Sequence, residues 1–177
     1  MNAELQLVPE IPATDAPRII LGLDPGSGRT GFGAISCTDD QVDFIECGCL
    51  STSQKDCREM RLRDLFEQLC VMFDRVQPHV AVVEELFFNR NVTTAMVVGE
   101  ARGVILLVAA QRNIPVVSYT ASAVKQAVTG SGNAKKNEVC FAVMQYLDLE
   151  VKPKPDDASD GLAIAICHKF WEDLEPS

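Results

Sequence analysis

The stretch IILGLDPGSGRTGFG, residues 19–33, decides the fold of this chain. Its apolar start predicts a buried strand that ends at Asp24, and a Pro-Gly-Ser-Gly turn leads into a second strand over residues 30–37. The turn glycines permit a tight reversal and let a backbone or an anion approach closely. Asp24 therefore either caps the hairpin through an Asx-turn or stands at the sheet edge, within reach of a metal ion or a phosphate.

The rest of the pattern predicts a single α/β domain. Residues 41–50 alternate and predict a third antiparallel strand, and residues 79–83 and 114–119 read as short buried strands. Helical spacing separates and follows these strands. We therefore expect a five-stranded mixed sheet flanked by helices. The expected helices cover residues 55–76, 93–111, 121–128, 136–147 and a last helix that reaches about Trp171.

Composition limits the class of protein. The 177 residues, 47% of them hydrophobic, suit one domain over residues 18–171, with a leader at 1–17 and an acidic tail at 172–177. No secretory signal precedes the domain, and Glu100 and Arg102 interrupt its most apolar segment, which predicts a cytoplasmic protein without a membrane partner. Seven cysteines without a CxxC pair predict reduced thiols and argue against zinc.

The net charge of −9 is unfavourable for a nucleic-acid partner, because phosphate contacts require Lys and Arg. The charge is unevenly distributed, however. Residues 1–17 and 172–177 each carry three acids and no Lys or Arg, which leaves −3 for residues 18–171. If four carboxylates there bind metal, the remainder is slightly basic. An acidic total therefore does not exclude DNA.

Three further acids lie at the ends of predicted elements, as Asp24 does. Glu84 ends a predicted parallel strand, at the sheet edge where α/β proteins bind ligands. Asp157 and Asp160 are three residues apart in the first turn of the last helix, about 60° apart around its axis. Asp156 lies off that face and is more simply an N-cap. The alternative is ordinary enrichment of acids in a first helical turn.

A loop over residues 85–92 carries two adjacent aromatic residues, Phe87 and Phe88, and the basic Arg90. Both aromatics belong to the core, or one of them stacks on or between bases. The helix over residues 93–111 is apolar nearly all round, so it is either central to the domain or also a subunit interface.

A glycine-rich turn over residues 129–133 is flanked by three lysines, Lys125, Lys135 and Lys136. They form either a solvated face or a set of phosphate contacts.

Five motifs in this order, LGLDPGSGRTGFG, VVEELFFNRN, GEARGV, VKQAVTGSGNAKK and DDASDGLAIAICH, resemble the RuvC family of Holliday-junction resolvases, in the ribonuclease H-like superfamily. The resemblance covers residues 19–168. It implies that the four carboxylates are catalytic metal ligands, that one aromatic probes the junction and that basic residues hold the DNA backbone. The acids are Asp24, Glu84, Asp157 and Asp160; the matched DNA-binding residues are Phe87, Lys125 and Lys136, and we expect Arg90 and Lys135 to hold phosphates as well.

The resemblance also implies cofactors and partners. We expect two Mg²⁺ ions per subunit, with Mn²⁺ able to substitute, because carboxylate oxygens without His or Cys suit these ions. We expect a homodimer on a four-way DNA junction, with the RuvA–RuvB branch-migration complex as partner. Alternatives are a related nuclease acting on RNA, a catalytically weak junction-binding module, or an actin-like kinase or ATPase, for which the chain has no second lobe or phosphate motif.

Overall fold

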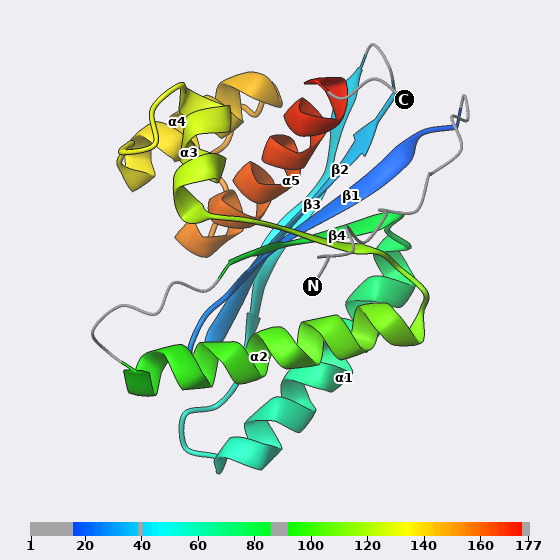
Figure 1. Cartoon of the computed structure of the whole chain (residues 1–177), viewed down its shortest axis with the longest axis vertical. Coiled ribbons are helices and arrows are strands. Elements are labelled where there is room, and N and C mark those ends of the chain that lie inside the picture. The colour runs from blue at the N-terminus through cyan, green and yellow to red at the C-terminus, as the bar shows by residue number, and fades with distance from the viewer. Residues whose placement is uncertain (1–15, 39–40, 86–91, 175–177) are drawn as a thin grey trace, which may run out of the picture.

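A five-stranded mixed sheet forms the middle layer of the computed structural model (Figure 1). The structure describes residues 16–38, 41–85 and 92–174. The strand order is β3-β2-β1-β4-β5, with β1, β2 and β3 antiparallel and β4 and β5 parallel to β1. The predicted fold class is confirmed. The elements are β1 (Arg18–Pro25), β2 (Arg29–Cys37), β3 (Val42–Ser51), α1 (Arg58–Val76), β4 (Val80–Glu84), α2 (Val92–Gln111), β5 (Val116–Tyr119), α3 (Ala121–Thr129), α4 (Lys136–Tyr146) and α5 (Asp156–Leu174).

Helices cover both faces of the sheet, which gives three layers (Figure 1). Successive residues of β1 point to opposite faces. Ile20 packs with α3, α4 and α5, whereas Leu21 and Leu23 pack with α1 and α2. The hydrophobic run at the start of the chain is thus divided between two cores, as expected for a strand that is buried on both faces.

Glycines bring α5 into backbone contact with β1 and β2. A methyl group built on Gly161 of α5 would lie 2.3 Å from the carbonyl carbon of Phe32. One built on Gly22 would lie 2.1 Å from the Gly161 carbonyl oxygen, and one on Gly31 would lie 2.2 Å from the Asp157 carbonyl oxygen. Only residues without a side chain allow this approach. The first turns of α5 therefore lie directly on the ends of β1 and β2.

The α2 helix packs less completely. Its buried residues are Ala101, Ile105, Val108 and Ala109. No described atom lies within 4 Å of a methyl group built on its Gly103. Side chains on this open side include two apolar ones that are more than half exposed. They are Met96 at 55% and Leu107 at 51%.

The same helix supplies the stretch Thr94–Gln111, which is long and apolar enough to cross a membrane by length and composition alone. Such a stretch is weak evidence for a membrane span, since helices of soluble proteins pass the same test. Here Arg102 donates a hydrogen bond to Ser118 of β5 at 3.0 Å, and Glu100 pairs with Arg58 of α1. These polar interactions attach α2 to its neighbours in the fold.

Two details differ from the sequence predictions. The α5 helix continues to Leu174, beyond the expected end near Trp171, and Glu172 pairs with Arg18 of β1 at 2.5 Å. Asp156 is the first residue of α5 rather than a cap before it, and its carboxylate lies 3.0 Å from Lys152 Nζ. All seven cysteines are free, as the sequence predicted.

Candidate active site

Four carboxylates meet at one edge of the sheet. Asp24 lies near the end of β1 and Glu84 ends β4; these two strands are parallel neighbours, with Leu23 in register with Val83. Asp157 and Asp160 lie at the start of α5. Gly31 lets this end of α5 approach β2, the strand that pairs with β1. The structure therefore brings together the four acids that the sequence predicted.

Burial and mutual repulsion change how these acids titrate. Desolvation, followed by the charges of Asp160 and Asp157, raises the pKa of Asp24 from 3.8 to about 6. Desolvation, followed by the charges of Asp24 and Asp160, raises the pKa of Glu84 from 4.5 to about 7. Desolvation also raises the pKa of Asp160. The carboxylates thus repel one another in a partly dry site, which favours the binding of a proton or a cation.

A cation of the protein itself already contacts two of the acids. The Lys136 ammonium lies 2.7 Å from Asp160 Oδ2 and 3.4 Å from Asp157 Oδ1, and these interactions raise its pKa. The Arg29 guanidinium is farther away, 3.9 Å from Asp157 Oδ2. No three His, Cys, Asp or Glu side chains have the spacing of a closed metal site in the part of the chain described.

The donor set nevertheless fits a hard divalent ion. It offers only carboxylate oxygens, the ligands that Mg²⁺ and Mn²⁺ prefer. The ammonium of Lys136 shows that the Asp157 and Asp160 side attracts positive charge. Since Lys136 is half exposed, its side chain can move away from these acids when another cation binds.

The predicted DNA-binding residues have different positions. Phe87 and Arg90 lie outside the described residues. Lys125 is close enough to the acids for its charge to lower the pKa of Glu84. Lys135 is exposed just before α4, and its backbone N–H donates a hydrogen bond to Glu138 Oε2 at 2.6 Å. Two of the three lysines, Lys125 and Lys136, are therefore electrostatically coupled to the acid cluster.

Sequence reasoning missed several polar residues beside the acids. Arg29 and Gln54 line a hollow of about 290 Å³ together with Asp24 and Asp157. Arg61 of α1 donates hydrogen bonds to the Ser27 carbonyl oxygen and to Thr52 Oγ1. The only available signal was the presence of Arg29 inside the opening hairpin.

The sheet order and the position of the carboxylates at its edge define a nuclease of the ribonuclease H-like class. Within that class, the family model for crossover junction endodeoxyribonuclease RuvC matches residues 20–168. The chain belongs to this family, whose members are metal-dependent nucleases.

Individual relatives agree with the family match. The crossover junction endodeoxyribonuclease RuvC of Pseudothermotoga lettingae is 48% identical over 150 residues, covering 85% of this chain and 93% of the relative. That of Desulforamulus reducens is 47% identical over 153 residues, covering 86% and 94%. The structure of T. thermophilus RuvC in complex with Holliday junction substrate superposes with a TM-score of 0.83 at 31% identity, covering 89% of this chain and 96% of that one.

Proposed function

We propose that this protein is a structure-selective DNA endonuclease that resolves four-way junctions by symmetric, metal-dependent phosphodiester hydrolysis in recombination and repair. The convergence of Asp24, Glu84, Asp157 and Asp160 at one sheet edge is the observation that carries the proposal. Family membership and the likeness to a protein solved with a Holliday junction support the substrate. The proposed nuclease domain spans residues 18–171, between a leader and an acidic tail.

In this proposal the four acids hold two Mg²⁺ ions, which Mn²⁺ can replace. When bound, the ions activate water and neutralise the charge that develops on the leaving 3′ oxygen. The protein holds the four carboxylates on two strands and one helix, so little reorganisation is needed when they bind cations. Before the ions can bind, Asp24 and Glu84 must lose the protons that their raised pKa values help them to retain, and Lys136 must move away from Asp160.

Symmetric cleavage requires two active sites related by a two-fold axis, so we propose a homodimer. The open side of α2, with Met96, Gly103 and Leu107, is the candidate interface because it is apolar and no described element covers it. Sedimentation at micromolar concentration tests this proposal. A monomer that stays monomeric when junction DNA is added would contradict it.

DNA contacts are assigned by residue type and position. Phe87 would open base stacking at the crossover, and Arg90, Lys125, Lys135 and Lys136 would hold phosphates. Phe87→Ala should lower the cleavage rate more than junction affinity. Lys136→Ala should weaken binding and reduce its salt dependence, because it removes one phosphate contact.

The deciding experiment incubates the protein with a synthetic four-way junction, a linear duplex and an RNA–DNA hybrid, with and without Mg²⁺, and uses Asp24→Asn as the control. Paired symmetric nicks confined to the junction, with ends that a ligase can seal, support the resolvase. Cleavage of the hybrid alone would indicate a nuclease acting on RNA. Junction binding without cleavage would indicate a binding module. A branch-migration complex as partner and a cytoplasmic location remain part of the same proposal.

A further inference from the structure

A polar hollow of about 290 Å³ shares Asp24 and Asp157 with the acid cluster. The rest of its lining comes from the turn between β1 and β2, from Arg29 and from Gln54. The hollow therefore presents carboxylates together with a guanidinium, a side-chain amide and a glycine-rich backbone. A ligand that fills the hollow must suit both kinds of surface.

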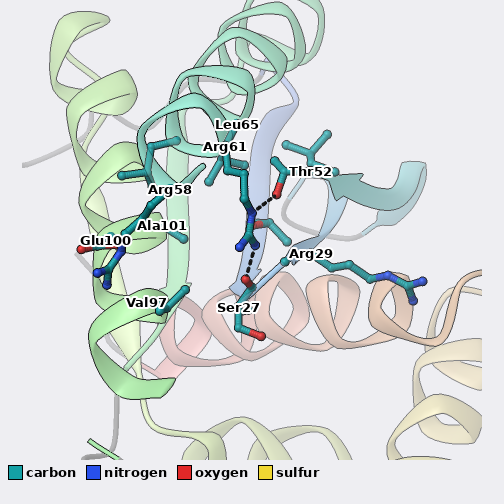
Figure 2. A pocket seen from close by; sticks show the side chains of 14 residues that line it. Ser27, Arg29, Thr52, Arg58, Arg61, Leu65, Val97, Glu100 and Ala101 are labelled. Atoms are coloured by element: carbon teal, nitrogen blue, oxygen red, sulfur yellow. Dashed lines mark hydrogen bonds and ion pairs between the residues drawn. The ribbon is translucent and has the colours of Figure 1, made fainter. Parts of the chain in front are cut away.

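Among the residues that line the hollow, Arg29 is the one with a positive charge. Its side chain is 66% exposed, and its contact with Asp157, at 3.9 Å, is at the limit of an ion pair. An exposed pair of this length contributes little energy. The neighbouring arginines are engaged, Arg58 with Glu100 and Arg61 with Ser27 and Thr52. Figure 2 shows the Arg29 side chain extending away from that cluster.

Arg61 holds the turn between β1 and β2 in place. Arg61 Nη2 donates to the Ser27 carbonyl oxygen at 2.5 Å, and Arg61 Nε donates to Thr52 Oγ1 at 3.3 Å (Figure 2). The Thr52 N–H donates to the Gly28 carbonyl oxygen at 3.2 Å. A methyl group built on Gly28 would lie 3.5 Å from Gln54 Nε2. Arg61 and Thr52 thus hold the turn that precedes Arg29 against the segment that carries Gln54. The backbone at Arg29 and at Gln54 is therefore held in place beside the acids.

We propose that Arg29 and Gln54 form a binding subsite for the phosphodiester that directly neighbours the scissile one on the same DNA strand. A guanidinium and an amide N–H both donate hydrogen bonds to phosphate oxygens, and the planar guanidinium does so in a bidentate manner. A strand whose scissile phosphate lies at the acids must continue past them, and Arg29 and Gln54 line a hollow that also includes Asp24 and Asp157. This inference rests on the proposed function, since it assumes that the acids cut a nucleic-acid strand.

The test is a double-mutant cycle in which one change is made in the protein and the other in the DNA substrate. Four-way junctions are made with a single uncharged methylphosphonate at one or the other phosphate flanking the scissile bond, and cleavage is measured under single-turnover conditions with saturating protein. The variants are Arg29→Ala and Gln54→Ala. Arg63→Ala is the matched control, because Arg63 is 63% exposed, has only an exposed pair with Glu67 and lies outside the hollow.

On the unmodified junction, Arg29→Ala should slow cleavage about tenfold or more, as expected for the loss of a charge-assisted hydrogen bond. At one flanking position the methylphosphonate should slow the wild type to a similar degree and slow Arg29→Ala no further. Gln54→Ala should show a smaller loss with the same position dependence. Arg63→Ala should follow the wild type on every substrate.

The inference would be overturned if the loss of rate from Arg29→Ala and the loss from the methylphosphonate are additive at both flanking positions. Arg29 would then act on the acids rather than on a phosphate. An Arg29→Ala protein that cleaves like Arg63→Ala would overturn it as well. In both cases cleavage by the wild type leaves the proposed function intact. A wild type that cuts no junction would overturn the proposed function together with the inference.

Discussion

The helices α5 and α2 are similar in length and α2 is the more apolar of the two, yet α5 packs more closely on the sheet. Every residue of α5 from Gly161 to Lys169 is buried, and its backbone touches β1 and β2 through Gly161. The buried residues of α2 lie on one side; on its other side no described atom lies within 4 Å of a methyl group built on Gly103, and Leu107 is 51% exposed. Hydrophobicity alone therefore does not determine how closely a helix packs.

The two helices also differ in what their packing provides. The close contact of α5 places Asp157 and Asp160 beside Asp24, where a small displacement would separate the acids. The open side of α2 has exposed apolar side chains and is the candidate interface of the proposed dimer. The contact at Gly161 is thus part of the candidate site, whereas Gly103 lies on the surface proposed for a partner. The predictions below test this difference.

Gly161→Ala should have the largest effect. Its methyl group would lie 2.3 Å from the Phe32 backbone, so α5 must shift outward. We expect a loss of about 3 kcal/mol of unfolding free energy and at least about a hundredfold slower cleavage. Urea unfolding and single-turnover cleavage measure the two effects. Wild-type values for both would contradict the close contact between α5 and the strands.

The metal-free protein should lose stability as the pH rises from 5 to 8. The pKa of Asp24 (about 6) and that of Glu84 (about 7) both exceed their unfolded values of 3.8 and 4.5, so the folded state binds more protons. This contribution is complete below pH 4 and is lost as the pH passes 6 and 7; at about 1.4 kcal/mol per pKa unit, about 4 kcal/mol of it is lost between pH 5 and 8.

The measurement is the melting temperature across that pH range in EDTA, for the wild type and for Asp24→Asn. The variant should show a shallower decline, and Mg²⁺ should raise the melting temperature of the wild type more than that of the variant. Equal pH slopes for the two proteins would show that Asp24 is not desolvated in the folded state.

Leu107→Glu should dissociate the proposed dimer while leaving the fold intact. Leu107 is 51% exposed on the open side of α2, so a carboxylate there meets water in the monomer and a partner surface in the dimer. Sedimentation should show monomers, with unfolding free energy changed by less than about 0.5 kcal/mol at monomeric concentration.

The adjacent residue provides the control. Val108 is fully buried, so Val108→Glu should unfold the protein instead of merely separating two folded subunits. A Leu107→Glu protein that remains dimeric would place the interface elsewhere.

Gly103→Ala should have the smallest effect and is the counterpart of Gly161→Ala. Because no atom of the described residues lies within 4 Å of the added methyl group, the monomer should gain about 0.5 to 1 kcal/mol from better helix propensity. Urea unfolding at low protein concentration measures this gain. Destabilisation of the monomer would mean that Gly103 already contacts another part of the chain.

The sequence predicts the layers and the four acids well because their signals are local. The apolar run over β1 and the helical spacing over α1 reflect which sides of each element are buried, and Asp24 and Glu84 follow directly from strand ends. The family motifs then favour a metal ligand over a turn residue at Asp24. The roles of Phe87 and Arg90 stay predictions, since these residues lie outside the described part of the chain.

Other features of the site depend on segments that are distant in sequence. Gly161 contacts Phe32 across more than a hundred residues, and neither residue has a local signal for that contact. Lys136 looked like one of three surface lysines, yet its ammonium lies on Asp160. Arg61 of α1 holds the turn beside Asp24 although 34 residues separate it from Ser27. Such contacts arise from tertiary approach, which spacing along the chain does not encode.

The position of α5 in the chain has a consequence for synthesis. α5 follows every strand in sequence, yet it packs directly on β1 and β2 and supplies two of the four acids. A nascent chain can form the hairpin early but cannot complete either that face of the core or the acid cluster before residues 156–174 have left the ribosome. Incomplete translation products that end before this helix would therefore lack two of the four acids.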